Sequence, residues 1–198
     1  MNSSDRYKVI YLTGAPATGK STLCWHVKNR LRNIVTYSYS ELLRDYVNRN
    51  SSSLVDECDI RQQSASIVTS YAVKEVDKWL HNELQTKRVS QHSIIDSHPV
   101  TKEEYGFRVT PFNPEQLNGI DPDIIICLYA KPDVIAERIR KDPAGRPLPS
   151  VFDIDMHLKL QASLAAQYSF STGKPLYLLD SGMKINALAD QVINLTGI

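Results

Sequence analysis

The stretch GAPATGKS, Gly14 to Ser21, decides the fold expected for this chain of 198 residues. It matches the pattern G-x-x-x-x-G-K-[ST], and its flanks have the character that this pattern requires. Before it, Val9 to Leu12 is an apolar, β-branched and aromatic run, as in a buried strand. After it, Ser21 to Arg32 contains no glycine or proline and repeats apolar residues at a helical spacing. The sequence therefore predicts a strand, a tight loop and a helix in succession.

The residue types in this loop suit the binding of nucleotide phosphates. Gly14 and Gly19 lack a Cβ atom, so the backbone can bring its amides close to an anion. The loop amides and the start of the following helix present N–H donors and a partial positive charge. Lys20 can reach the β- and γ-phosphates, and the Ser21 hydroxyl is a natural magnesium ligand. We expect ATP phosphates to be bound by Gly14, Ala15, Pro16, Ala17, Thr18, Gly19, Lys20, Ser21 and Thr22.

Composition limits the class of protein. Hydrophobic residues make up 42% and charged residues 23%, which is ordinary for a globular protein. The net charge of +1 gives no indication of binding to nucleic acid or to a membrane surface. The cysteines at 24, 58 and 127 form no C-x-x-C pair and suit a reducing compartment. The N-terminus MNSSDRYK lacks the apolar core of a signal peptide, and no apolar run reaches membrane-spanning length. We expect one domain over residues 1–198, located in the cytoplasm.

Strand-like and helix-like segments alternate along the chain. Strands are expected at 33–37, 89–96, 123–129 and 176–179, and helices at 38–47, 56–86, 132–141, 154–168 and 184–196. Residues 98–114 are expected to be an irregular connection, and Trp25 and Trp79 to be core residues. Alternation of this kind predicts an α/β fold: a three-layer α/β/α sandwich around a parallel sheet.

Four segments follow predicted strand ends and should meet in one cleft: 14–21, 38–44, 96–98 and 180–182. Asp96 ends a strand beside the phosphate loop, where a carboxylate can bind magnesium through water. The alternative is that the strand simply stops at a polar turn. The chemistry favours the magnesium role.

With these segments placed, the chain resembles the nucleoside monophosphate kinases, and adenylate kinases of the archaeal type in particular. Four segments carry the resemblance: GAPATGKS, SYSELLR, IIDSHP, and RIRKDPAGRP followed by DIDMH. The resemblance implies a helical acceptor-binding part at about 38–86 and a short arginine-bearing lid at about 138–151. It also places Arg44 where these enzymes hold the acceptor phosphate, and Arg138 and Arg146 in the lid.

The activity implied is transfer of the γ-phosphoryl group of ATP to a nucleoside monophosphate, AMP or a related purine monophosphate, with Mg²⁺ as cofactor. The residues implied in catalysis are Lys20, Asp96, Arg138 and Arg146. Those implied in binding the acceptor are Ser38, Arg44, His98 and Arg108. Ser21 and, through water, Asp96 are the implied magnesium ligands.

Two other functions stay open at this stage. Many adenylate kinases have an arginine soon after the strand-end aspartate, whereas here none occurs between Asp96 and Arg108. The acceptor could therefore be a small metabolite alcohol, although SYSELLR favours a nucleotide. The chain could also be an ATP-binding switch or slow ATPase that presents a surface to a partner.

Overall fold

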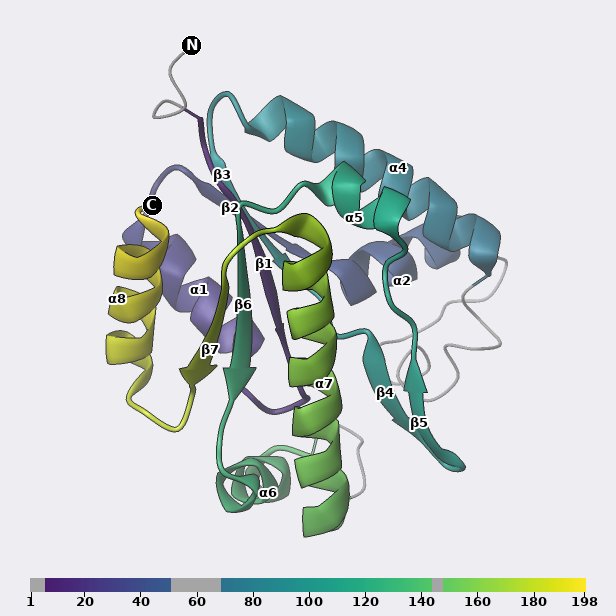
Figure 1. Ribbon diagram of the computed structural model, residues 1–198, viewed down its shortest axis with the longest axis vertical. Helices are drawn as coiled ribbons and strands as arrows, with labels where there is room; N and C mark the ends of the chain where they lie inside the picture. The colour runs from purple at the N-terminus through teal and green to yellow at the C-terminus, as the bar shows by residue number, and fades with distance from the viewer. Residues whose placement is uncertain (1–5, 51–68, 144–147) are drawn as a thin grey trace.

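Five parallel strands form the centre of the molecule in this computed structural model, which describes residues 6–50, 69–143 and 148–198. Their order across the sheet is β2-β3-β1-β6-β7 (Figure 1). The strands are β1 (Val9–Gly14), β2 (Ile34–Ser38), β3 (His92–Asp96), β6 (Ile124–Tyr129) and β7 (Leu176–Asp180). The predicted α/β sandwich with a parallel sheet is confirmed.

Side chains of β1 alternate between two cores because successive residues of a strand point to opposite faces. Val9 and Tyr11 lie in the core beneath α4 (Ser70–Lys87), α5 (Pro114–Ile120) and α7 (Val151–Thr172). Ile10 and Leu12 lie in the opposite core, beneath α1 (Lys20–Arg30) and α8 (Ile185–Thr196). All six residues of β1 are buried, so this strand is the central element of the three layers.

The chain leaves neighbouring strands in opposite directions at the carboxyl edge of the sheet. After β1 it runs through α1 to the edge strand β2, whereas after β3 it runs to β6 on the other side of β1. The register sets Leu12 beside Asp96 and Gly14 beside Leu128. Strand ends that diverge in this way leave a crevice, which is where open α/β sheets bind ligands.

The prediction that residues 98–114 are irregular was wrong. Val100–Glu103 (β4) and Gly106–Val109 (β5) form an antiparallel hairpin, which turns at Glu104 and Tyr105 just before Gly106, whose φ is 139°. The helix α5 then begins behind a capping box formed by Asn113 and Gln116. The prolines and glycine stand at the ends of these elements rather than inside them, so they mark turns between short elements.

The helix predicted at 56–86 is described only in its second part, α4, and residues 56–68 lie outside the described residues. The buried residues of α4 are Ala72, Val76, Leu80 and Leu84, whereas Tyr71 is exposed.

Trp25 and Trp79 are 61% and 48% exposed, so their assignment to the core was wrong. In α1 the buried positions are Lys20, Leu23, Cys24 and Val27, which leaves Trp25 on the outer side. Trp79 lies just off the buried stripe of α4 and packs edge-on against Tyr37.

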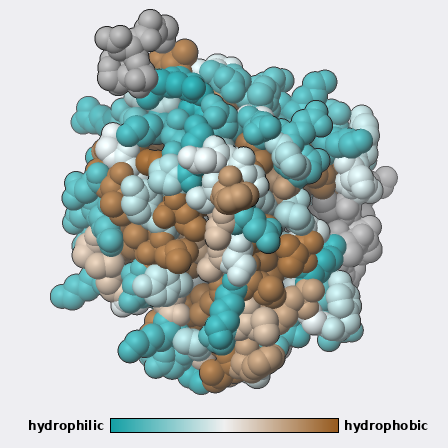
Figure 2. Space-filling model, in the orientation of Figure 1, coloured by the Kyte–Doolittle hydropathy of each residue, from teal (hydrophilic) through white to brown (hydrophobic). Residues whose placement is uncertain are grey.

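The remaining described helices are α2 (Tyr39–Asn50) and α6 (Pro132–Lys141). Apolar side chains are visible among polar ones on the face that carries α7 and β7 (Figure 2). Leu178 is 51% exposed because β7 is an edge strand. Within the described ranges, no helix is both long enough and apolar enough to span a membrane.

Candidate active site

The loop between β1 and α1 has the backbone conformation of an anion-binding loop. Gly14, Ala17 and Gly19 have φ angles of 152°, 62° and 88°. A Cβ atom on Gly14 would lie 2.8 Å from both the Leu128 carbonyl oxygen and Thr18 Oγ1, so only glycine fits there. The helix that follows has no side-chain cap and no acidic residue in its first turn. Its first amides are therefore not used by a capping side chain and can serve an anion.

Lys20 lies inside this loop and is only 8% exposed. Its Nζ donates to the Gly14 carbonyl oxygen at 2.9 Å, and the Ala15 carbonyl oxygen lies at 3.5 Å. The ammonium group is thus held by the loop itself. This places a positive charge where the amides of the loop gather.

Asp96 ends β3 beside the first turn of α1. Ser21 Oγ donates to Asp96 Oδ2 at 3.4 Å, while the buried Asp96 Oδ1 has no hydrogen-bond partner among the described residues. Burial raises the pKa of the Asp96 carboxyl, although the Lys20 charge and the Ser21 hydroxyl partly offset this. A desolvated carboxylate with one uncompensated oxygen favours a cationic ligand.

A hydroxyl and a carboxylate side by side fit Mg²⁺, which prefers hard oxygen ligands and keeps several of its waters. The unpartnered Oδ1 is the observation that favours this over a purely structural pair. Ser21 and Asp96 are therefore the residues of this chain that suit a magnesium ion.

A cleft of about 1970 Å³ begins at the phosphate loop and extends between α2, α4 and the β4–β5 hairpin. Predicted site residues that line it are Ala15, Pro16, Ala17, Gly19, Lys20, Ser21, Thr22, Ser38, Arg44, Asp96, His98 and Arg108. Gly14 and Thr18 belong to the loop without lining the cleft. The topology thus brings together both predicted groups of residues, those for ATP and those for the acceptor.

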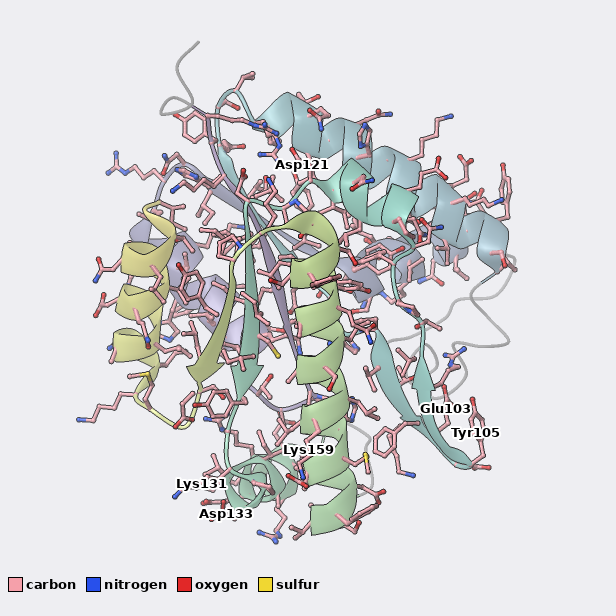
Figure 3. All side chains as sticks on the ribbon, viewed as in Figure 1. Glu103, Tyr105, Asp121, Lys131, Asp133 and Lys159 are labelled. Atoms are coloured by element: carbon pink, nitrogen blue, oxygen red, sulfur yellow. The ribbon has the colours of Figure 1, made fainter. Side chains whose placement is uncertain are left out.

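The two arginines predicted to bind the acceptor each lie beside a carboxylate. Arg44 Nη2 lies 3.3 Å from Asp45 Oδ1, and Arg108 Nε lies 3.1 Å from Glu103 Oε1 across the hairpin. Figure 3 shows Glu103 and Tyr105 on that hairpin, away from the body of the sheet. Ser38 Oγ accepts a 3.4 Å hydrogen bond from the Glu41 amide at the start of α2. Its role toward an acceptor stays a prediction, as do those of the two arginines and His98.

Arg138 occupies a different place from the one that a lid residue would take. Its guanidinium donates to the carbonyl oxygens of Ala17 and Ser181 at 3.2 and 2.6 Å, and to Ser181 Oγ at 3.3 Å. It thereby joins the phosphate loop to the loop after β7, and it does not line the cleft. The second predicted lid arginine, Arg146, lies outside the described residues.

Sequence reasoning missed a polar group that joins three helices of the acceptor side. Asp77 of α4 accepts from the Tyr39 hydroxyl of α2 at 2.6 Å and from the Gln116 amide of α5. Tyr39 packs edge-on against Phe112, with ring centroids 5.1 Å apart. Asp77 is one turn from Val73 and Leu80 on the cleft wall, and this spacing was the only available signal.

It also missed two polar residues on the buried face of α7. His157 Nε2 lies 2.9 Å from the Val100 carbonyl oxygen of the hairpin, and burial lowers the pKa of His157 to about 4. Gln161, one turn later, donates to Thr13 Oγ1. Both occur at the helical spacing of Ile154, Leu164 and Tyr168, so polar residues in an apolar stripe were the signal.

Comparison with known proteins agrees with this geometry. The AAA domain family matches residues 13–152, which includes the phosphate loop and Asp96. An adenylate kinase of Methanothermobacter thermautotrophicus is 22% identical over 175 residues, which cover 84% of this chain and 86% of that protein.

Solved structures with similar folds include two of nearly the same length. A tunicamycin resistance protein of Deinococcus radiodurans has a TM-score of 0.62 at 15% identity, covering 98% of this chain and 97% of that one. A shikimate kinase of Bacteroides thetaiotaomicron has a TM-score of 0.59 at 17% identity, covering 96% and 99%. At these identities the likeness concerns the fold.

Proposed function

The chain belongs to the AAA domain family, and from this premise we propose that it is a magnesium-dependent kinase acting on a nucleoside monophosphate. The donor would be ATP, and AMP or a related purine monophosphate is the preferred acceptor. The likeness to an adenylate kinase over most of both chains supports this choice.

The observation that carries the proposal is the volume of the cleft. A pocket for one small ligand typically measures about 300–1,000 Å³, and this cleft has about 1970 Å³. One end holds the phosphate loop and Asp96, and the other holds Arg44 and Arg108. A nucleotide switch needs one ligand site, whereas a kinase needs two that meet. The size therefore favours a two-substrate enzyme.

The residues of this chain have distinct roles in the transfer. The loop amides and Lys20 would hold the ATP phosphates, and Arg138 would fix the loop through Ala17 and Ser181. Ser21 and Asp96 would hold Mg²⁺, which neutralises phosphate charge when bound. The bond from the γ-phosphorus to its bridging oxygen breaks as a bond to an acceptor oxygen forms, so catalysis depends mainly on alignment and charge.

A small-metabolite kinase is the second candidate. Arg44 and Arg108, the guanidinium groups that line the far end of the cleft, each lie beside a carboxylate. A phosphate would have to compete with Asp45 and Glu103 for them, whereas an acceptor with only hydroxyl groups would not.

The cysteines described, Cys24 and Cys127, are free and buried, which is consistent with our placing the protein in the reducing cytoplasm.

Incubation of the full chain with Mg-ATP and a panel of monophosphates and metabolite alcohols tests the proposal. We expect one purine monophosphate to become its diphosphate as one ADP forms from each ATP consumed, so that AMP would give two ADP per transfer. Phosphate on an alcohol instead would select the second candidate. ADP and free phosphate with every mixture, at the rate seen in water alone, would make the protein an ATPase.

A further inference from the structure

A buried chain of hydrogen bonds links α7 to the two strand ends that carry the candidate active site. Gln161 Nε2 donates to Thr13 Oγ1 at 2.5 Å, and Thr13 Oγ1 donates to the Ser97 carbonyl oxygen at 2.7 Å. Gln161 and Thr13 are each 1% exposed, and Ser97 is 4% exposed. Thr13 directly precedes the phosphate loop, and Ser97 directly follows Asp96.

The direction of this chain is fixed by its atoms. The Thr13 hydroxyl has one hydrogen, and the Ser97 carbonyl takes it, so the hydroxyl oxygen must receive a donor from elsewhere. The Gln161 amide supplies that donor. The Ser97 amide also donates to the Leu12 carbonyl oxygen at 3.1 Å, so β1 and β3 are tied at this level from both sides.

Packing alone does not explain a glutamine at position 161. Its Oε1 is buried and has no hydrogen-bond partner among the described residues. Leaving a buried acceptor unsatisfied costs more than one neutral hydrogen bond contributes, so an apolar residue of similar size would stabilise the fold at least as well. Residues that lower stability in this way are characteristic of functional positions.

We propose that Gln161 is a positioning residue, which acts through Thr13 and the Ser97 carbonyl to fix the phosphate loop relative to Asp96. The proposal rests on the proposed binding of Mg²⁺ and nucleotide. Asp96 directly precedes Ser97, and Ser21 lies in α1 at the end of the loop that Thr13 precedes. A shift between β1 and β3 would therefore separate the two magnesium ligands. Gln161 touches neither, and its effect is on the geometry of the pair.

Gln161→Met is the decisive substitution because methionine keeps the length of the side chain and removes both polar atoms. We measure the affinity of the full chain for ADP by calorimetry, with Mg²⁺ and with a chelator. The quantity compared is the dissociation constant with chelator divided by the dissociation constant with Mg²⁺. We expect this ratio to fall about 10-fold in Gln161→Met, the usual loss when an outer partner of a metal site is removed. We expect affinity without Mg²⁺ to stay within about 3-fold, and the melting temperature to be unchanged or higher.

Thr13→Val tests the middle of the chain, and we expect it to lower the same ratio. The double variant should lose no more than the worse single variant, because both break one connection. Ser169→Ala is the matched control on α7, since its hydroxyl donates a part-buried hydrogen bond to the Lys174 carbonyl oxygen, away from Thr13 and Ser97. It should lower the melting temperature and leave the ratio unchanged.

A wild-type ratio in Gln161→Met would overturn the inference, whether or not its melting temperature falls as that of Ser169→Ala does. Failure of the wild-type protein to bind ADP in either condition would instead overturn the proposed function, and this inference with it.

Discussion

At the amino edge of the sheet the charge of the buried Arg88 is paired with two carboxylates, although its Nε has no hydrogen-bond partner among the described residues. At the carboxyl edge the buried Asp96 carboxylate has an oxygen without a partner in the described part of the chain. Arg88 is 5% exposed and lies 2.8 Å from Asp123 Oδ2 and 3.1 Å from Asp121 Oδ2. Arg6 and Lys174 also pair with Asp121. Asp121 lies at one end of the molecule in Figure 3, and the labelled hairpin residues Glu103 and Tyr105 lie toward the other.

The two edges shift the pKa of an aspartate in opposite directions. Burial alone would raise the pKa of Asp121, but the Arg6 hydrogen bond and the Arg88 and Lys174 charges lower it below its usual range. For Asp96 burial prevails, and its pKa is raised. Compensated charge holds strands together, and uncompensated charge is available to a ligand. The amino edge therefore serves mainly to stabilise the fold, and the carboxyl edge is the one suited to binding a ligand.

Lys20→Ala should abolish phosphoryl transfer at the carboxyl edge of the sheet while leaving the fold intact. Transition-state charge would lose its fixed cation, so we expect phosphoryl transfer to fall about 10³-fold or more. Turnover with the acceptor found by the panel measures this, and circular dichroism checks folding. Lys28→Ala, on an exposed position of the same helix, should retain full activity. Normal turnover in a folded Lys20→Ala protein would refute the phosphate-loop mechanism.

Arg88→Met should have the reverse outcome at the amino edge. Asp121 and Asp123 would lose their shared partner, although Asp121 keeps Arg6 and Lys174. Hydrogen bonds to charged groups contribute about 1.5–3 kcal/mol, so we expect a loss of that size in unfolding free energy. Urea unfolding measures the loss. Arg30→Met, which removes the exposed pair with Asp190, should cost about 1 kcal/mol or less. Nucleotide affinity of the folded Arg88→Met protein should be unchanged, and a large loss of affinity would contradict the division between the two edges.

Mild acid should lower the free energy of unfolding through His157, which packs against the hairpin beyond the carboxyl edge of the sheet. His157 has an ordinary pKa of 6.5 when unfolded and about 4 when folded, because burial disfavours its charged form. The unfolded chain therefore takes up a proton that the folded chain does not, and stability should fall by about 2–3 kcal/mol as pH falls from about 6.5 toward 4.

Urea unfolding at several pH values measures this, and His157→Gln should flatten the slope within that window. Asp121→Asn is the comparison. Because the pKa of Asp121 is lowered in the folded chain, its contribution to stability is fully present at pH values above the ordinary pKa of an aspartate. That contribution is lost only when the pH falls below this value. An unchanged slope in His157→Gln would contradict the assignment.

Arg44→Ala should give the smallest effect, on one substrate only. We expect the acceptor KM to rise about 10- to 100-fold, because a charge-assisted hydrogen bond contributes about 1.5–3 kcal/mol, and the ATP KM to change little. Steady-state kinetics with each substrate varied in turn measures both values. Arg49→Ala, exposed on the same helix, is the control. Equal changes in both KM values would favour the ATPase-switch alternative.

The central sheet and the phosphate loop were predictable because each has a strong local signal. The apolar runs of the five strands and the fixed spacing of Gly14, Gly19 and Lys20 are properties of the chain itself. Asp96 followed from topology, since strand ends at one edge must meet.

The hairpin and the contacts of α7 could not be predicted in the same way. Val100–Glu103 and Gly106–Val109 are four-residue strands whose pairing depends on tertiary contacts, including His157 with Val100. The link from Gln161 to Thr13 spans 148 positions, and no local pattern in a single sequence encodes such a contact. The position of Arg138 depended likewise on a loop 43 residues away.

The strand order has a consequence for how the protein is made. In the sheet, β1 is flanked by β3 and β6, neither of which follows it directly in the chain. All sheet contacts of the phosphate-loop strand are thus long-range, which makes for slow folding through late, costly loop closures. During synthesis from the N-terminus, β1 has a bare flank until Ile124–Tyr129 has left the ribosome, and the Thr13 hydroxyl lacks its donor until α7 follows. A nascent chain would therefore carry an apolar strand with an unpaired side for most of its synthesis, and such an edge favours aggregation until it is covered.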